Sequence, residues 1–108
     1  MASIEQLAPR EAATRLGRDD SPRLIDVRTP GEYAHVHLSG SVHMPMSEIA
    51  ERVDELDPDE PLIILCHHGV RSFRVAAWLI SNGFTDVANL ARGIDGWSLE
   101  VDSTVPRY

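Results

Sequence analysis

The run Leu62-Ile63-Ile64-Leu65 constrains the fold more than any other part of the chain. It is continuously apolar, only four residues long and preceded by Pro61. A strand with one face in water alternates apolar and polar residues, whereas a strand buried on both faces does not. The run therefore predicts a central strand of a parallel sheet that is covered on both sides.

Other short apolar runs predict further strands of the same sheet. The candidates are residues 24–27, the weaker run 87–90, residues 42–44 before Pro45, and an edge strand at 4–7. Amphipathic segments lie between them and predict helices at residues 9–16, 47–53, 72–82 and 94–99. Gly17 and the pair Asn82-Gly83 stand just past two of these helices, where C-caps are expected.

This alternation of strands and helices predicts βαβ units and an α/β fold. The length suits one domain over residues 1–108. The tail, residues 101–108, has no clear period and predicts no regular element.

Composition narrows the possible partners. Seventeen acidic residues against ten Lys and Arg give a net charge of −7, which disfavours nucleic acid as a partner. No apolar run approaches the roughly 18 residues of a membrane-spanning helix. Residues 1–5 lack the basic and apolar regions of a signal peptide. We therefore expect a cytoplasmic protein that binds neither nucleic acid nor membranes.

The chain has a single cysteine, Cys66. It cannot form an internal disulfide, nor a structural zinc site of several thiolates within one chain. Free cysteines are most often small buried hydrophobic residues, and composition alone favours that interpretation. The position of Cys66 favours a reactive thiol instead, because functional groups in open α/β sheets lie beyond the carboxyl ends of the strands.

The chain runs from the central strand into the clearest predicted helix through Cys66-His67-His68-Gly69-Val70-Arg71-Ser72. So short a segment can curl until successive backbone N–H groups point inward as an anion-binding nest. Gly69 permits backbone angles that other residues resist, and a helix opening at Ser72 adds its positive end. These features favour the thiolate of Cys66 and would also hold an oxyanion such as thiosulfate.

Three side chains of this loop have more than one possible role. Arg71 stands at a helix start, a poor place for a cation, so we expect it to be paired or to face an anion. The adjacent His67 and His68 do not easily face one metal ion, and no third ligand is obvious, so we expect no metal. We expect both to donate backbone N–H groups and to shape the pocket wall. A role as general base for Cys66 stays open.

Five short motifs follow one another along nearly the whole chain. They are Leu24-Ile25-Asp26-Val27-Arg28 with Glu32-Tyr33, then His37-Leu38-Ser39-Gly40 with Met44-Pro45, the run 66–72, Asn82-Gly83-Phe84, and Leu90-Ala91-Arg92-Gly93-Ile94-Asp95-Gly96-Trp97. Each is weak alone, but five in this order are specific. Together they resemble the single-domain rhodaneses, which are thiosulfate sulfurtransferase-like modules.

The resemblance implies a five-stranded parallel sheet with helices on both faces, and an enzyme that transfers a sulfane sulfur. The catalytic cysteine of the family maps onto Cys66. Its cradle of backbone amides maps onto His67, His68, Gly69, Val70, Arg71 and Ser72. In the family mechanism the thiolate takes the outer sulfur of a donor and becomes a persulfide, with sulfite leaving when the donor is thiosulfate. Cyanide or a thiol then accepts the sulfur, and this exchange should show ping-pong kinetics.

The acceptor stays open. A persulfide carrier that delivers sulfur to a partner protein, in cofactor or tRNA sulfuration, shares the first half of this chemistry. We expect no cofactor in either case. A non-catalytic interaction module is disfavoured, because the chain keeps Cys66, Gly69 and Arg71.

We expect Asp26, Arg28 and Glu32 to support the site rather than to react. Arg28 and Glu32 are spaced to pair across a tight turn, and Asp26 ends a strand near the active face. Three residues depart from the family pattern, which commonly has Gly, Gly and Ala at these positions: Val36, Arg92 and Gly96. Arg92 stands near the rim of the pocket, which leaves substrate preference open.

Phosphatase chemistry is the main rival from another class. Related folds attack phosphate with a Cys–Arg loop in which Arg follows Cys by six positions. Here Arg71 follows Cys66 by five positions, and Ser72 occupies the sixth. The shorter loop suits the outer sulfur of a persulfide better than a phosphoryl group. An arsenate reductase meets the same objection and would also need a second cysteine.

Overall fold

The apolar run expected at the centre of the sheet forms β4 (Leu62–Leu65), and all of its residues are buried. In the computed structural model, β4 lies between β5 (Val87–Leu90) and β2 (Arg23–Asp26). The edges of the sheet are β1 (Glu5–Leu7) and β3 (Val42–His43), so the strand order is β1-β5-β4-β2-β3. Every pairing in it is parallel, which confirms the expected five-stranded parallel sheet.

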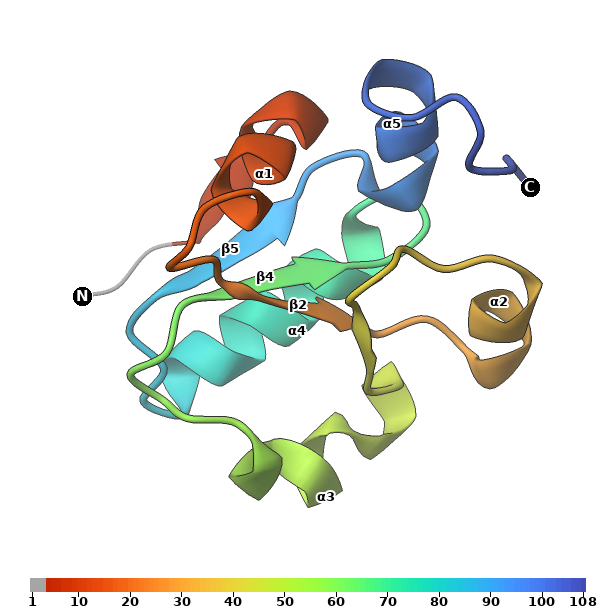
Figure 1. The fold of residues 1–108 in the computed structure, drawn as a ribbon. Helices are drawn as coiled ribbons and strands as arrows, with labels where there is room; N and C mark the ends of the chain where they lie inside the picture. Colours follow the sequence, from red (N-terminus) through yellow and green to blue (C-terminus); the bar gives the residue numbers. More distant parts are fainter. Residues whose placement is uncertain (1–3) are drawn as a thin grey trace.

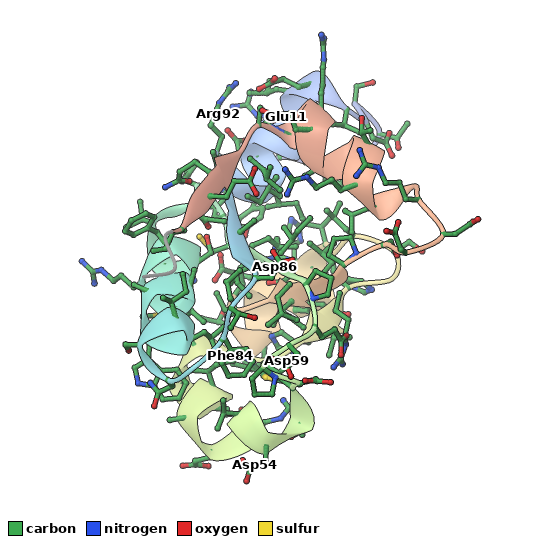
Figure 2. The ribbon with its side chains drawn as sticks, turned by 90° about the vertical axis from the view of Figure 1, so that its left-hand side faces the viewer. Glu11, Asp54, Asp59, Phe84, Asp86 and Arg92 are labelled. Atoms are coloured by element: carbon green, nitrogen blue, oxygen red, sulfur yellow. The ribbon has the colours of Figure 1, made fainter. Side chains whose placement is uncertain are left out.

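Helices cover both faces of this sheet, as expected. They are α1 (Pro9–Leu16), α2 (Pro30–His35), α3 (Ile49–Arg52), α4 (Val70–Ser81) and α5 (Gly93–Glu100), with the 3₁₀ turns Met46–Glu48 and Val53–Glu55 flanking α3. Figure 1 shows α1 and α5 on one face, and α3 and α4 on the other. In Figure 2, Glu11 and Arg92 lie at the end formed by α1 and α5, and Asp54 lies at the opposite end near α3.

The two faces of the sheet are buried in separate apolar cores. Ile64 packs in the same core as Val75 of α4, whereas its neighbour Ile63 packs in the core that contains Ile94 of α5. Because successive side chains of a strand point to opposite faces, Cys66 continues the side of Ile64 and lies in the core beneath α4. Burial on both faces explains why β4 shows no apolar–polar alternation.

Three predicted helices differ in their bounds from those observed, the last of them by only one residue at each end, since α5 spans Gly93–Glu100. α4 begins at Val70 and not at Ser72, because Gly69 adopts a left-handed conformation (φ 95°) and turns the chain into the helix two residues earlier. The helix expected over residues 47–53 is a single α-helical turn between two 3₁₀ turns. The earlier start of α4 places Ser72 inside its first turn.

Helix α2 is absent from the elements predicted above. Its six residues are too few to display a period. It begins with a capping box, because the Thr29 hydroxyl accepts from the backbone N–H of Glu32 and the Glu32 carboxylate accepts from the backbone N–H of Thr29. Pro30 occupies its first turn. The sequence Thr-Pro-x-Glu is thus the signal by which this helix is found.

The structure describes residues 4–108. Residues 1–3, part of the segment that shows no signal-peptide pattern, lie outside the described residues. None of the helices within residues 4–108 is long and apolar enough to cross a bilayer. The tail that follows α5 ends on the side of the molecule where α2 lies (Figure 1).

Candidate active site around Cys66

Cys66 follows the last residue of β4 and is 1% exposed. Its Sγ accepts hydrogen bonds from the backbone N–H groups of Gly69 and Ser72, at 3.1 Å and 3.4 Å. One donor comes from the loop and the other from the first turn of α4. Of the six backbone amides expected in the cradle, those of Gly69 and Ser72 thus donate to the sulfur, and both donors stabilise negative charge on it.

Two glycines allow the chain to close tightly around this loop. Gly69 has φ 95°, and a Cβ on it would lie 3.1 Å from the backbone nitrogen of Arg92. A Cβ on Gly93 would overlap the carbonyl oxygens of both Cys66 and His67. This overlap excludes any side chain at Gly93.

The carbonyls that approach Gly93 are themselves hydrogen-bonded. The backbone N–H of Ile94 donates to the Cys66 oxygen at 2.9 Å, and that of Asp95 donates to the His67 oxygen at 3.1 Å. The first turn of α5 thus holds the start of the loop, while α4 continues its end. The two helices position the sulfur from opposite faces of the sheet.

A buried polar chain lies behind the sulfur. The Ser72 Oγ is 3.2 Å from the Cys66 Sγ and 2.5 Å from the Asn89 Oδ1. The Asn89 Nδ2 donates to the Gly69 carbonyl oxygen at 3.1 Å and to the Gln6 Oε1 at 2.9 Å. Asn89 and Gln6 are absent from the predicted site. The signal for Asn89 is an amide within the otherwise apolar run of β5, where a buried polar group requires partners.

Arg71 is paired, as its place at a helix start predicts. Its guanidinium makes two parallel hydrogen bonds to the Glu32 carboxylate, at 2.6 Å and 3.0 Å. The Arg71 guanidinium holds the pKa of Glu32 well below its usual range. The same pair raises the pKa of Arg71. The ion pair ties α2 to the first turn of α4.

The predicted pair between Arg28 and Glu32 is wrong. The guanidinium of Arg28 binds the carboxylate of Asp26, with Nε to Oδ1 at 2.9 Å and Nη2 to Oδ2 at 2.6 Å. Both side chains are fully buried. The reason is that the Glu32 carboxylate points toward the start of α2 and Arg71, whereas Arg28 turns inward beside Asp26. Burial opposes the charge of Arg28, but its bonds to Asp26 and Tyr108 outweigh this and raise its pKa.

The Arg28 guanidinium also binds the turn after α2. Its Nη2 donates to the carbonyl oxygen of Val36 at 2.6 Å. Val36 stands where the family commonly has glycine, yet its backbone is extended (φ −160°), a conformation open to any residue. Valine therefore adopts this backbone without strain.

Tyr108 connects the two ion pairs. Its hydroxyl accepts from the Arg28 Nη1 at 2.9 Å and donates to the Glu32 Oε2 at 2.7 Å. Its ring stacks on His67, with centroids 3.9 Å apart and planes 8° apart. Burial, together with the bond to Glu32, raises the pKa of Tyr108 to about 12, so its hydroxyl remains protonated at neutral pH. The tail offers no sequence signal for this contact.

The two histidines form a stacked wall beside the loop. The His67 and His68 rings lie 3.9 Å apart at an angle of 26°, and burial and the neighbouring His68 lower the pKa of His67. Asp95 is a possible third metal ligand, which the sequence analysis did not identify. The side chains of His67, His68 and Asp95 offer nitrogen and oxygen atoms within 4.8 Å of one another. Arg107 already binds the Asp95 carboxylate at 2.8 Å. Nearly parallel rings also point poorly at one ion, since a metal lies in the plane of each imidazole.

Hollows lie on two sides of the loop. One, of about 340 Å³, is lined by Val27, Arg28, Thr29, Pro30, Pro45, Met46, Ser47 and Arg71. The other, an open groove of about 560 Å³, is lined by Gln6, His68, Gly69, Val70, Phe73, Arg74, Asn89, Ala91 and Arg92. The Val70 side chain is 62% exposed, so its part in the cradle is limited to its backbone. The site as a whole is a buried thiol at the focus of backbone donors, which suits nucleophilic chemistry.

Comparisons with known proteins find relatives of this chain. A family model described as the rhodanese-like domain matches residues 8–100. The chain is 35% identical over 97 residues to a protein of Pseudomonas fluorescens named thiosulfate sulfurtransferase GlpE, covering 90% of this chain and 87% of that one. It is 32% identical over 97 residues to YrkF of Bacillus subtilis, provisionally named a sulfur carrier protein, and covers 52% of it. The crystal structure of a rhodanese-like domain protein from Staphylococcus aureus superposes with a TM-score of 0.84 at 26% identity, over 97% of this chain and 99% of that one.

Proposed function

Because the chain belongs to the rhodanese-like family of sulfurtransferases, we propose that Cys66 is the nucleophile that receives and passes on a sulfane sulfur. The observation that carries this proposal is the position of Sγ. It accepts from the backbone N–H groups of Gly69 and Ser72 at the start of α4. Those donors stabilise the thiolate, which is the attacking form.

The first half of the proposed reaction loads the cysteine. The Cys66 thiolate attacks the outer sulfur of thiosulfate, and a new S–S bond forms as the old one breaks. Sulfite leaves with the bonding electron pair. The product is a persulfide whose negative charge lies on the outer sulfur, where the loop amides and the α4 terminus attract it.

The second half returns the enzyme to its starting state. An acceptor nucleophile, either cyanide or a thiol, attacks the outer sulfur, and the Cys66 thiolate leaves with the electron pair of the S–S bond. We propose that Arg71 fixes the shape of the loop in both halves of the reaction, in addition to any neutralisation of the substrate's charge. Its guanidinium is already held by Glu32 through two hydrogen bonds.

A partner protein as acceptor is the second candidate. The similarity to YrkF favours it, since that protein is provisionally named a sulfur carrier.

We also propose a reducing compartment, the cytoplasm, because the nucleophile must stay a free thiol between turnovers. All five strands share one sheet, which supports one domain over residues 1–108.

The test of the nucleophile is thiocyanate formation from thiosulfate and cyanide by the wild type and by Cys66→Ser. We expect activity to be lost in Cys66→Ser and retained in Ser39→Ala, a matched change at an exposed serine outside the site. Mass spectrometry after thiosulfate treatment should show one added sulfur on Cys66. Thiocyanate formation that survives Cys66→Ser would refute the assignment, and hydrolysis of an aryl phosphate that depends on Cys66 would favour a phosphatase instead.

Replacing cyanide by dithiothreitol, and then by a sulfur-accepting protein, separates the two acceptor classes. Direct transfer of sulfur to dithiothreitol, at a rate comparable to that of transfer to cyanide, favours the sulfurtransferase. A persulfide that resists the small thiol but is discharged by the protein favours the carrier.

A further inference from the structure

The polar chain behind Cys66 has a definite direction, which follows from one carbonyl group. Asn89 presents one end of its amide to the Gly69 carbonyl oxygen, at 3.1 Å. A carbonyl oxygen only accepts hydrogen bonds, so the amide nitrogen must be the end that faces it. The other end, the Asn89 Oδ1, therefore faces Ser72.

This orientation uses the only proton of the Ser72 hydroxyl. The Asn89 Oδ1 cannot donate, so the hydroxyl 2.5 Å away must donate to it. The Ser72 Oγ then presents only lone pairs to the Cys66 Sγ, 3.2 Å away on its other side. With the cysteine protonated, the S–H group donates to the Ser72 oxygen.

We propose that Asn89 is a positioning residue that turns the Ser72 hydroxyl away from Cys66 and so favours the thiol over the free thiolate. To donate to a thiolate, the Ser72 hydroxyl must leave Asn89, whose buried Oδ1 then has no donor. In the persulfide, the Ser72 hydroxyl does not have to choose between the sulfur and Asn89 as its acceptor. The inner sulfur of the persulfide carries neither proton nor charge, and the Ser72–Asn89 bond stays intact. Asn89 thus favours the resting and the loaded forms over the reactive form between them.

Other groups near the sulfur also influence its charge and remain unchanged in the test variants. Arg71 faces Cys66 from α4 and is paired with Glu32 of α2. The Asp26–Arg28 pair lies at the end of β2, beside β4. His67 follows Cys66 directly, and burial lowers the pKa of its imidazole, which favours the uncharged ring. A shift in the titration midpoint of Cys66 on changing Asn89 is therefore measured with the surrounding charged groups unchanged.

The experiment is the pH profile of Cys66 alkylation by iodoacetamide, with the ultraviolet absorbance of the thiolate as a second readout. In Asn89→Leu the Ser72 hydroxyl is free to donate to the thiolate, so the midpoint should move to lower pH by about one unit. The same substitution in a Ser72→Ala background should move the midpoint little. Gln6→Leu is the matched control, because it removes a partner of Asn89 but leaves the Asn89–Ser72 bond, and its profile should match the wild type.

Ser72→Ala alone gives a second test by its sign, should Asn89→Leu not fold. A hydroxyl that accepts from the thiol is lost, so the midpoint should stay or fall. A rise of about one unit would show that Ser72 donates to the thiolate and would overturn the proposal. So would an Asn89→Leu shift that persists in the Ser72→Ala background, or no shift at all.

The inference rests on the proposed role of Cys66, but the two fail separately. Turnover that survives Cys66→Ser would refute the nucleophile, while the alkylation profile needs only a thiol at position 66. An unaltered profile in Asn89→Leu, with turnover still dependent on Cys66, would refute only the role of Asn89.

Discussion

Arg92 and Gly96 depart from the rhodanese pattern together, and the structure predicts that they depend on each other. Arg92 has φ 68°, and among residues 4–108 it is the one non-glycine residue with a positive φ. Gly96 lies one turn further along α5. A Cβ on Gly96 would lie 2.6 Å from the Arg92 Cβ, an atom fixed by the backbone, and 3.1 Å from the Cγ of Pro9. Where the family has Gly and Ala, this chain has Arg and Gly.

The perturbation is Gly96→Ala, made in the wild type and in Arg92→Gly. Alanine in a helix gains about 1 kcal/mol over glycine. Against Arg92, the overlap at 2.6 Å costs about 2–3 kcal/mol by overpacking, so the single variant should lose about 1–2 kcal/mol. In the Arg92→Gly background the overlap with the Arg92 Cβ disappears and only the 3.1 Å contact with Pro9 remains, so most of the gain of about 1 kcal/mol should be kept. The coupling between the two sites is therefore about 2–3 kcal/mol.

Arg92→Gly alone should change stability by less than about 1 kcal/mol. Relief of left-handed strain gains about 1 kcal/mol, and the greater freedom of glycine in the unfolded chain offsets most of it. The exposed ion pair of Arg92 with Glu100 adds little.

The assay is urea unfolding of all four proteins, followed by tryptophan fluorescence and extrapolated linearly. Equal effects of Gly96→Ala in the two backgrounds would refute the coupling. Greater stability of Gly96→Ala in the wild-type background would refute the steric argument itself.

Three further outcomes follow from the contacts around the site. Arg28→Met leaves the Asp26 carboxylate buried without its partner, so urea unfolding should show a loss of about 3–5 kcal/mol. Tyr108→Phe keeps the stack on His67 but loses two hydrogen bonds, which should cost about 1–2 kcal/mol and lower Tm. The lowered pKa of Glu32 means that its carboxylate stabilises the fold above the ordinary glutamate pKa of about 4.3, and that this contribution is lost as the pH falls toward the lower folded value. Glu32→Gln should therefore lose less stability than the wild type between about pH 5 and pH 2.

Matched controls distinguish these effects from general damage. Tyr33→Phe removes the other tyrosine hydroxyl, which makes one bond of 3.3 Å, and should cost less than Tyr108→Phe. Glu51→Gln changes an exposed glutamate without a partner in the described ion pairs and should leave the acid profile unchanged. If Glu32→Gln follows the wild-type profile, then the Arg71 pair does not stabilise the fold.

The centre of the sheet was predictable from the sequence, because burial on both faces leaves a pattern in β4 that needs no knowledge of its neighbours. The loop after β4 was also predictable, since its glycine and the helix that follows are local features. The start of α4 was misplaced because the positive φ of Gly69 is not visible in a periodicity argument. α2 is announced by its capping box alone, since six residues carry no helical period.

The partners of the charged residues were harder to predict. Arg28 and Glu32 have a spacing that suits a pair, but Arg28 turned inward to Asp26 and Glu32 bound Arg71, 39 residues away. Tyr108 reaches Arg28 across 80 residues, from a tail without any period. Such contacts depend on the packing of whole elements, which local spacing does not encode.

The hydrogen bonds from α5 to the loop have a dynamic consequence. The amide protons of Ile94 and Asp95 exchange with solvent only when the Cys66 and His67 carbonyls release them. The exchange rates of these two amides therefore report how often the sulfur site opens. Because the Cys66 and His67 carbonyls pack directly on Gly93 and are bonded to the next two amides, we expect the site to open together with the first turn of α5.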